Sequence, residues 1–233
     1  MILQDFYNIH KNQPIFIIGS GASVDYYPCD NFKDLITIGV NMAYKHFDLK
    51  YNILHHHSLI PDCINFIDKG SKTRFFVSEY DCGVIDSKFV NKHKSELYIT
   101  YKHNNQTYQR IEHNIFDYIE NDSLYVGGTT TVNAISLAVY MGSNNIILVG
   151  CDAGSINGDT NFKNYYNQTP ENKAYQQYHS VVTVDLIKKI RDILKTKNIS
   201  LTMLSPFLDY KLEGNKYCKN YEIPNNNSKL ESK

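Results

Sequence analysis

The sequence lacks an excess of charge of either sign and lacks any long apolar run. Its 24 Lys and Arg residues balance 24 Asp and Glu residues, so overall charge gives no electrostatic case for nucleic acid as the main partner. No stretch approaches the ~18 consecutive apolar residues of a membrane span. Residues 1–14 lack a basic region followed by an apolar one, so we expect no signal peptide. Together these absences predict a cytoplasmic protein with no integral membrane segment.

Cysteine is sparse as well, and it is scattered. The five cysteines are Cys29, Cys63, Cys82, Cys151 and Cys218, and none forms a C-x-x-C pair. An odd, dispersed set fits neither a disulfide framework nor a zinc site. The sequence also contains no P-loop motif and no D-x-D motif. We therefore expect free thiols in a reducing compartment, and no metal site.

What the sequence does contain is a series of short β-branched runs that alternate with segments of helical spacing. With 233 residues, 42% of them hydrophobic, the chain is long enough for one domain with a substantial core. The predicted strands are Ile15–Ile18, Leu35–Val40, Tyr51–Leu54, Arg74–Val77, Ile146–Val149 and Ile199–Leu204. The predicted helices are centred on Ile111–Ile119, Ala134–Met141 and Leu186–Ile193. This alternation predicts a Rossmann-like, three-layer α/β domain with a mainly parallel sheet.

Two polar regions interrupt or follow this pattern. Residues 91–108 are polar and irregular, which predicts a surface loop or an inserted hairpin. Residues 213–233 are rich in Asn, Lys and Ser and poor in apolar residues, a composition typical of a disordered tail. The prediction is therefore a single α/β domain over residues 1–212, followed by that tail.

In open α/β sheets, ligands bind beyond the carboxyl ends of the strands. Gly19-Ser20-Gly21-Ala22-Ser23 follows the first predicted strand, and its glycines would let backbone N–H groups approach a phosphate closely. The alternative is a tight strand-to-helix turn with no ligand. Asn41 ends the second strand, where an NAD site carries an acidic residue. An amide at that position argues against a dehydrogenase.

Two further segments are candidates for ligand binding. Thr129–Thr131 follow two glycines and open a helix, which offers a threonine N-cap, unpaired N–H groups and the positive end of the dipole. The alternative is a capped helix and nothing more. Gly150 and Asp152 follow the strongest predicted strand. The carboxylate would accept hydrogen bonds from a sugar or ribose, unless it is only a loop or capping acid.

Histidines supply the remaining candidates. His55–His57 follow the third strand, but consecutive residues point to opposite faces, so only His55 and His57 would share an ion, and a polar loop is favoured over a metal site. His179 precedes the late helix. A helix start disfavours the charged form of a histidine, and a neutral imidazole takes a proton from an attacking hydroxyl. The alternative is a histidine on a surface loop.

The order and spacing of four motifs resemble a known group of proteins. They are IIGSGASVD (Ile17–Asp25), IGVNMAY (Ile38–Tyr44), GGTTTVNAISLAVYMGSNNIILVGCD (Gly127–Asp152) and YHS (Tyr178–Ser180). Together they resemble the bacterial sialyltransferases of glycosyltransferase family 42. They also resemble the wider group that includes the motility accessory factors and the 6-hydroxymethylpterin diphosphokinase-like domains.

The resemblance implies a nucleotide-binding, metal-independent, inverting glycosyltransferase that needs no cofactor. Its donor would be a CMP-sugar such as CMP-sialic acid, and its acceptor a glycan. His179 would be the general base. The residues that would hold the donor are Gly19, Ser20, Gly21, Ser23, Asn41, Thr129, Thr130, Gly150 and Asp152.

The chain also departs from the group at two places. The sialyltransferases carry tyrosines shortly after Gly-x-Asp, and here the nearest are Tyr165 and Tyr166. The pterin kinases carry an Asp-rich segment where this chain has Leu54–His57. An ATP-dependent pyrophosphokinase and a non-catalytic nucleotide-binding module remain the alternative functions. The sequence leaves open whether the protein is a homo-oligomer.

Overall fold

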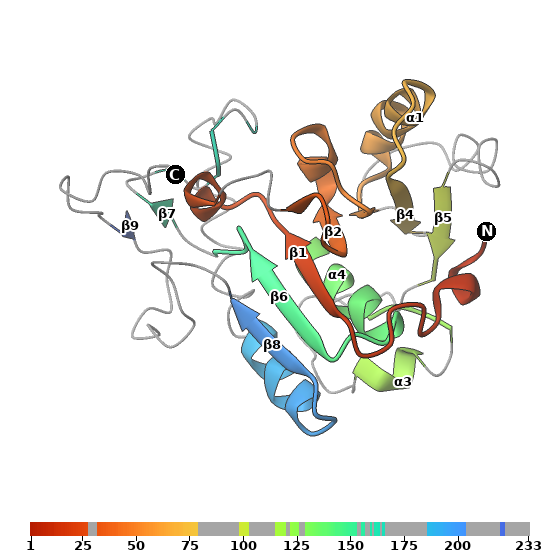
Figure 1. Ribbon diagram of the computed structural model, residues 1–233, viewed down its shortest axis with the longest axis vertical. Coiled ribbons are helices and arrows are strands. Elements are labelled where there is room, and N and C mark those ends of the chain that lie inside the picture. The colour runs from red at the N-terminus through yellow and green to blue at the C-terminus, as the bar shows by residue number, and fades with distance from the viewer. Residues whose placement is uncertain are drawn as a thin grey trace.

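A seven-stranded, all-parallel sheet forms the centre of the molecule (Figure 1). The computed structural model describes residues 1–27, 32–78, 98–102, 115–119, 122–125, 129–152, 155–156, 159, 161–163, 165, 186–203 and 220–221. The strands are β1 Pro14–Ile18, β2 Thr37–Val40, β3 Tyr51–Leu54, β4 Arg74–Ser78, β5 Tyr98–Tyr101, β6 Asn145–Val149 and β8 Ser200–Met203. Their spatial order is β5-β4-β3-β2-β1-β6-β8. The predicted Rossmann-like parallel sheet is confirmed.

Strand β1 marks the point where the order of the sheet changes direction. It pairs with β2 on one side and with β6 on the other. The chain builds outward from β1 through β2, β3, β4 and β5, and then continues on the opposite side with β6 and β8. Central strands of such a sheet are covered on both faces, which explains why β1 and β6 are short, nearly continuous apolar runs.

Helices cover both faces of the sheet, as in a three-layer domain. The first hydrophobic cluster lies between one face and η1 (Leu3–Phe6), α3 (Ile115–Ile119), α4 (Thr130–Tyr140) and the helix at residues 186–195. The second lies between the other face and η2 (Ala22–Tyr26), η4 (Asn41–Lys45), η5 (His57–Leu59) and α1 (Ile60–Asp68). In the described part of the chain, no helix is both long and apolar enough to span a bilayer.

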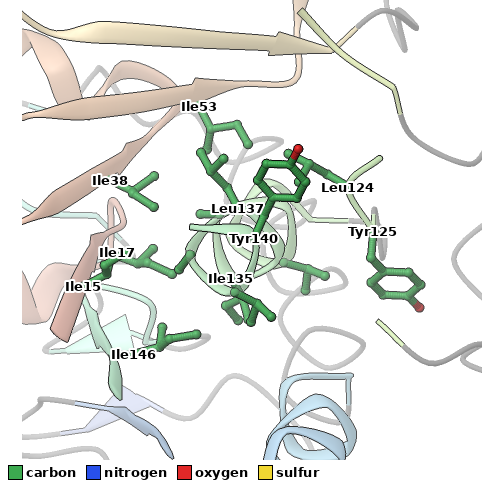
Figure 2. Packing of buried hydrophobic residues seen from close by; sticks show 14 of the residues in the cluster. Ile15, Ile17, Ile38, Ile53, Leu124, Tyr125, Ile135, Leu137, Tyr140 and Ile146 are labelled. Carbon is green, nitrogen blue, oxygen red and sulfur yellow. The ribbon is translucent and has the colours of Figure 1, made fainter. Parts of the chain in front are cut away.

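Helix α4 is the most buried of these elements. Ten of its 11 residues are buried, and it contains most of the helix predicted around Ala134–Met141. Figure 2 shows Ile135 and Leu137 of this helix among Ile17, Ile38 and Ile53 of the sheet. Helices that are buried all round carry apolar or small residues on every side. The position of α4 beneath the central strands therefore fixes where its first turn lies.

The structure corrects the prediction for residues 91–108. Tyr98–Tyr101 form β5, which pairs in parallel with β4 at the edge of the sheet, so the prediction of a loop or hairpin is wrong there. Strand β5 has only four residues and its sequence neighbours are polar, so its alternation of buried side chains was too short to detect. Ile99 and Tyr101 are nevertheless buried.

A second, smaller sheet involves the segment expected to be a disordered tail. Within that segment, β9 (Asn220–Tyr221) pairs in parallel with β7 (Ser155–Ile156). The other residues of the segment lie outside the described part of the chain. Disorder of this tail therefore stays a prediction.

Candidate functional site

The loops that follow β1 and β6 meet beyond the carboxyl ends of these two neighbouring strands. The Gly19 N–H donates to the carbonyl of Val149 over 2.8 Å, and the Gly21 N–H donates to the carbonyl of Gly150 over 2.6 Å. The strand order reverses between β1 and β6, and open α/β sheets bind ligands beyond the strand ends at such a point. The structure thus brings Gly19–Ser23 and Gly150–Asp152 together, as the sequence predicted.

The glycines are explained by the contact between these loops. A Cβ at position 19 would clash with the carbonyl oxygen of Gly150, and a Cβ at position 21 would lie 2.6 Å from Asp152 Oδ2. Gly150 itself has φ +65° and lies against Val24, so it needs both the conformational freedom and the small size of glycine. The Gly19 N–H is bonded to Val149 at the end of β6, and the Gly21 N–H is bonded to Gly150 in the loop that follows. Both N–H groups therefore have partners within the protein, and a ligand role for these glycines stays a prediction.

Ser23 and Asp152 form a buried pair that locks the two loops. The Ser23 N–H donates to Asp152 Oδ2 over 2.7 Å, and the Ser23 hydroxyl donates to Asp152 Oδ1. Ser23 is fully buried and Asp152 is only 8% exposed. Burial raises the pKa of the Asp152 carboxyl, and the two bonds from Ser23 partly oppose that rise. The sequence analysis suggested that the Asp152 carboxylate would bind a sugar or ribose. In the structure, both of its oxygens accept hydrogen bonds from Ser23.

A third segment closes over the glycine loop. The Phe162 N–H and the Asn161 side-chain amide both donate to the carbonyl of Ser20 over 3.1 Å. Next to them, the Lys163 N–H donates to the Asp25 carboxylate over 2.9 Å. The main chain of Ser20 is thus tied to the segment that follows Gly-x-Asp.

The same segment carries Tyr165, one of the two tyrosines nearest to the position where the sialyltransferases carry theirs. The Tyr165 ring lies with its centroid 5.9 Å from that of His46 and 5.0 Å from that of Phe162. His46 directly follows η4, so Tyr165 sits against the element that begins at Asn41. Tyr166 lies outside the described residues, and the role of both tyrosines stays a prediction.

Asn41 directly follows β2, begins η4 and has an unusual backbone conformation. Its φ is +51°, in the left-handed region. Its carbonyl accepts a 2.9 Å hydrogen bond from the side-chain amide of Asn52, which lies within β3. The Asn41 Oδ1 atom is buried and has no hydrogen-bond partner among the described residues. Asn41 therefore offers an acceptor at the carboxyl edge of the sheet.

The first turn of α4 approaches the same edge. Thr129 is the N-cap, because its side-chain oxygen accepts from the Val132 N–H over 3.3 Å. Thr130 is the first residue of the helix and is 9% exposed. The predicted helix start is confirmed, and the cap is Thr129. The ligand roles of both threonines stay predictions.

A polar network joins α4 to the end of β3. The Asn133 amide nitrogen lies 3.2 Å from His55 Nδ1 and donates to the Tyr101 hydroxyl over 3.0 Å. His57 is buried, and its Nε2 lies 2.8 Å from the carbonyl of Ser78. His55 and His57 therefore contact different parts of the protein. In the described ranges, no group of three His, Cys, Asp or Glu side chains is arranged to hold a metal ion.

Several predicted groups lie outside the described residues. They are His179, which the resemblance makes the general base, the glycines Gly127 and Gly128, and the YHS motif around His179. Their proposed roles remain predictions.

Sequence reasoning missed four polar residues near the site. Asn52 and Asn133 are fully buried in a strand and a helix that are otherwise largely apolar, and a polar residue inside an apolar run was the signal available for both. Asn161 gave no such signal because its partner, Ser20, is distant in sequence. The fourth residue is Tyr27, and burial, together with the nearby Asp152 charge, raises the pKa of its phenol to about 12.

Comparisons with known proteins agree with the motif resemblance at the level of the wider group. The family model described as 6-hydroxymethylpterin diphosphokinase MptE-like matches residues 2–158. No curated protein sequence matches the chain significantly. A solved structure of the sialyltransferase CstII from Campylobacter jejuni, in complex with a substrate analogue, cytidine-5'-monophosphate, is 13% identical, with a TM-score of 0.49; the match covers 84% of this chain and 81% of that one. A likeness at this level does not bear on function.

Proposed function

Because the chain belongs to the 6-hydroxymethylpterin diphosphokinase MptE-like family, we propose that the loops after β1 and β6 bind a nucleotide and that the protein is a nucleotide-dependent transferase. The observation that carries this proposal is the meeting of Gly19–Ser23 with Gly150–Asp152 at the reversal of strand order. Crevices at such a point are the usual ligand sites of open α/β sheets. The capped start of α4 supports an anionic ligand, since helix N-termini favour phosphates.

The donor in this proposal is a CMP-sugar. The motif resemblance supports it, and Asn41 in place of an acid argues against NAD. In the transfer step, an oxygen of the glycan acceptor bonds to the anomeric carbon of the sugar. The bond from that carbon to the phosphate oxygen breaks, CMP leaves, and the configuration inverts. Amide groups at the start of α4 would stabilise the charge that develops on the leaving phosphate.

The acceptor hydroxyl must lose its proton as the new bond forms. His179 is the proposed general base, because it occupies the position of the basic histidine in the resembling sialyltransferases. Histidine suits this task near neutral pH, where its neutral form is abundant.

The second candidate is an ATP-dependent pyrophosphokinase, which the description of the matched family favours. That reaction moves two phosphates from ATP to a hydroxyl, and acidic metal ligands usually support such transfers. The chain carries His55–His57 where the pterin kinases carry an Asp-rich segment. This difference makes the sugar transferase the first choice.

Calorimetry with four ligands separates the candidates. CMP or a CMP-sugar is expected to bind without added metal, whereas a pyrophosphokinase would bind ATP with Mg²⁺ and release AMP when given a pterin alcohol. A ligand at a hundredfold excess over its Kd raises the free energy of unfolding by roughly 2.7 kcal/mol, so thermal shifts provide an independent check. Strong NAD binding with no response to CMP would contradict the proposal.

A variant of the proposed base tests the chemical step. His179→Ala is expected to lower turnover by about 10²–10⁴-fold while CMP affinity changes little, because the base acts on the acceptor. The two measurements are CMP release from a CMP-sugar and calorimetry with CMP. A variant that keeps the wild-type rate removes His179 from the mechanism.

A further inference from the structure

We propose that Asn52 is a positioning residue, which holds Asn41 in its left-handed conformation and thereby prepares Asn41 for the nucleotide. This inference rests on the proposed function, because it assumes that Asn41 contacts the ligand. Asn52 lies inside β3, and no sequence motif singled it out.

Asn52 lies across β2 because Gly39 leaves room for it. The two residues are partners in the parallel pairing of β2 with β3. A Cβ at position 39 would clash with Asn52 Oδ1 and with the Leu49 side chain. The absence of a side chain at Gly39 therefore lets the Asn52 amide reach along β2 toward the end of that strand.

At the end of β2, the Asn52 amide meets an unusual residue. Asn41 has φ +51°, a conformation that L-residues rarely adopt and that asparagine tolerates better than most. The Asn52 side-chain amide donates to the Asn41 carbonyl over 2.9 Å. The pairing of β2 with β3 ends at Val40, so this bond continues the contact between the strands by one residue and fixes the peptide group that follows Asn41.

The Asn52 amide is energetically unfavourable in this position, which indicates that it does more than fill space in the core. Asn52 is fully buried, and its Oδ1 has no hydrogen-bond partner among the described residues. An unpaired amide oxygen in a protein interior is unfavourable, and an apolar side chain at this position would avoid it. Leu54, the other β3 residue on this face, is apolar. The bond to Asn41 is the contact that requires an amide.

A fixed backbone conformation at Asn41 also fixes the position of its side-chain oxygen. The Asn41 Oδ1 atom is a buried acceptor with no partner among the described residues. It therefore suits a ligand group with an N–H or O–H, such as the amino group of a base or a ribose hydroxyl. In this arrangement Asn52 does not touch the ligand, and it acts only through Asn41.

The test compares two variants that each lose one buried bond from a side chain to a carbonyl. Asn52→Leu loses the bond to Asn41. Thr73→Val is the matched control, because the buried Thr73 hydroxyl donates to the carbonyl of Leu49 over 2.8 Å, just ahead of β3 and away from its carboxyl end. We expect Asn52→Leu to weaken CMP binding about tenfold, the equivalent of about 1.4 kcal/mol, and Thr73→Val to leave it unchanged. Thermal unfolding of both variants reports their stability, and Asn52→Ala replaces Asn52→Leu if the latter does not fold.

A second measurement needs no nucleotide. The backbone ¹³C chemical shifts of Asn41 are expected to report the left-handed conformation in the wild type and its loss in Asn52→Leu. If Asn41 keeps these shifts in the variant, the inference fails and the proposed function is untouched. If the shifts change and CMP affinity does not, the inference also fails. A wild type that binds no nucleotide overturns the proposed function, and the inference with it.

Discussion

At the scale of single residues, the main feature is the hydrogen bonding of the buried Asp152 carboxylate to Ser23. Its two oxygens accept from the backbone and the hydroxyl of one residue. These contacts need an acceptor for the N–H and a partner for the hydroxyl. An asparagine would meet both needs, with its oxygen facing the Ser23 N–H and its NH₂ group facing the Ser23 hydroxyl oxygen.

The pKa of Asp152 gives this pair a pH-dependent effect on stability. Burial raises the pKa above its ordinary value of 3.8. Between 3.8 and the raised value, the folded protein keeps a proton that the unfolded chain has lost, so the free energy of unfolding falls as pH rises. Asp152→Asn lacks this proton. We expect the variant to gain stability relative to the wild type through this pH window, by up to about 1.4 kcal/mol per pH unit.

Denaturant unfolding at a series of pH values measures this difference directly. Ser23→Ala is the companion variant: it removes the hydroxyl donor but keeps the backbone N–H, so it is expected to lose about 1.5–3 kcal/mol, the range for a hydrogen bond to a charged group. A stability difference between Asp152→Asn and the wild type that is flat across the acidic range would show that the carboxyl pKa is not raised.

At the scale of elements, the start of α4 separates a capping role from a ligand role. Thr129 supplies the cap, and Thr130 stands next to it inside the first turn. Thr129→Ala is expected to lower the free energy of unfolding by about 1 kcal/mol. Thr130→Ala keeps the cap and is expected to lower nucleotide affinity more than stability. Chemical denaturation and calorimetry with CMP on the same two proteins check both statements.

Two outcomes would contradict these expectations for Thr129 and Thr130. If Thr130→Ala binds CMP as the wild type does, Thr130 is only the first residue of a buried helix. If Thr129→Ala unfolds at the same denaturant concentration as the wild type, the side-chain bond to the Val132 amide contributes little, and the helix is held by its buried contacts alone.

At the scale of the whole molecule, the parallel sheet carries most of the fold and the C-terminal segment adds one short pairing. Deleting residues from Asn225 onward keeps β9 and is expected to leave Tm within error, because the removed residues have the composition of a disordered segment. Deletion from Glu213 also removes the β7–β9 pairing and serves as the comparison. Calorimetric unfolding of both truncated proteins is the measurement, and a large drop in Tm for the shorter deletion would show that the end of the chain packs against the domain.

Sequence patterns alone predicted the α/β class, the strands β1, β3, β4 and β6, and the two loops that form the candidate site. Those features are local: apolar runs, glycines and a threonine cap act within a few residues of each other. The structure alone decided which strands are neighbours, that Tyr98–Tyr101 joins the sheet edge, and that Ser23 holds Asp152 across 129 positions of sequence. It also decided that Asn52 reaches Asn41 over Gly39. Those contacts depend on strand register and on the room between strands, which no pattern along the chain records.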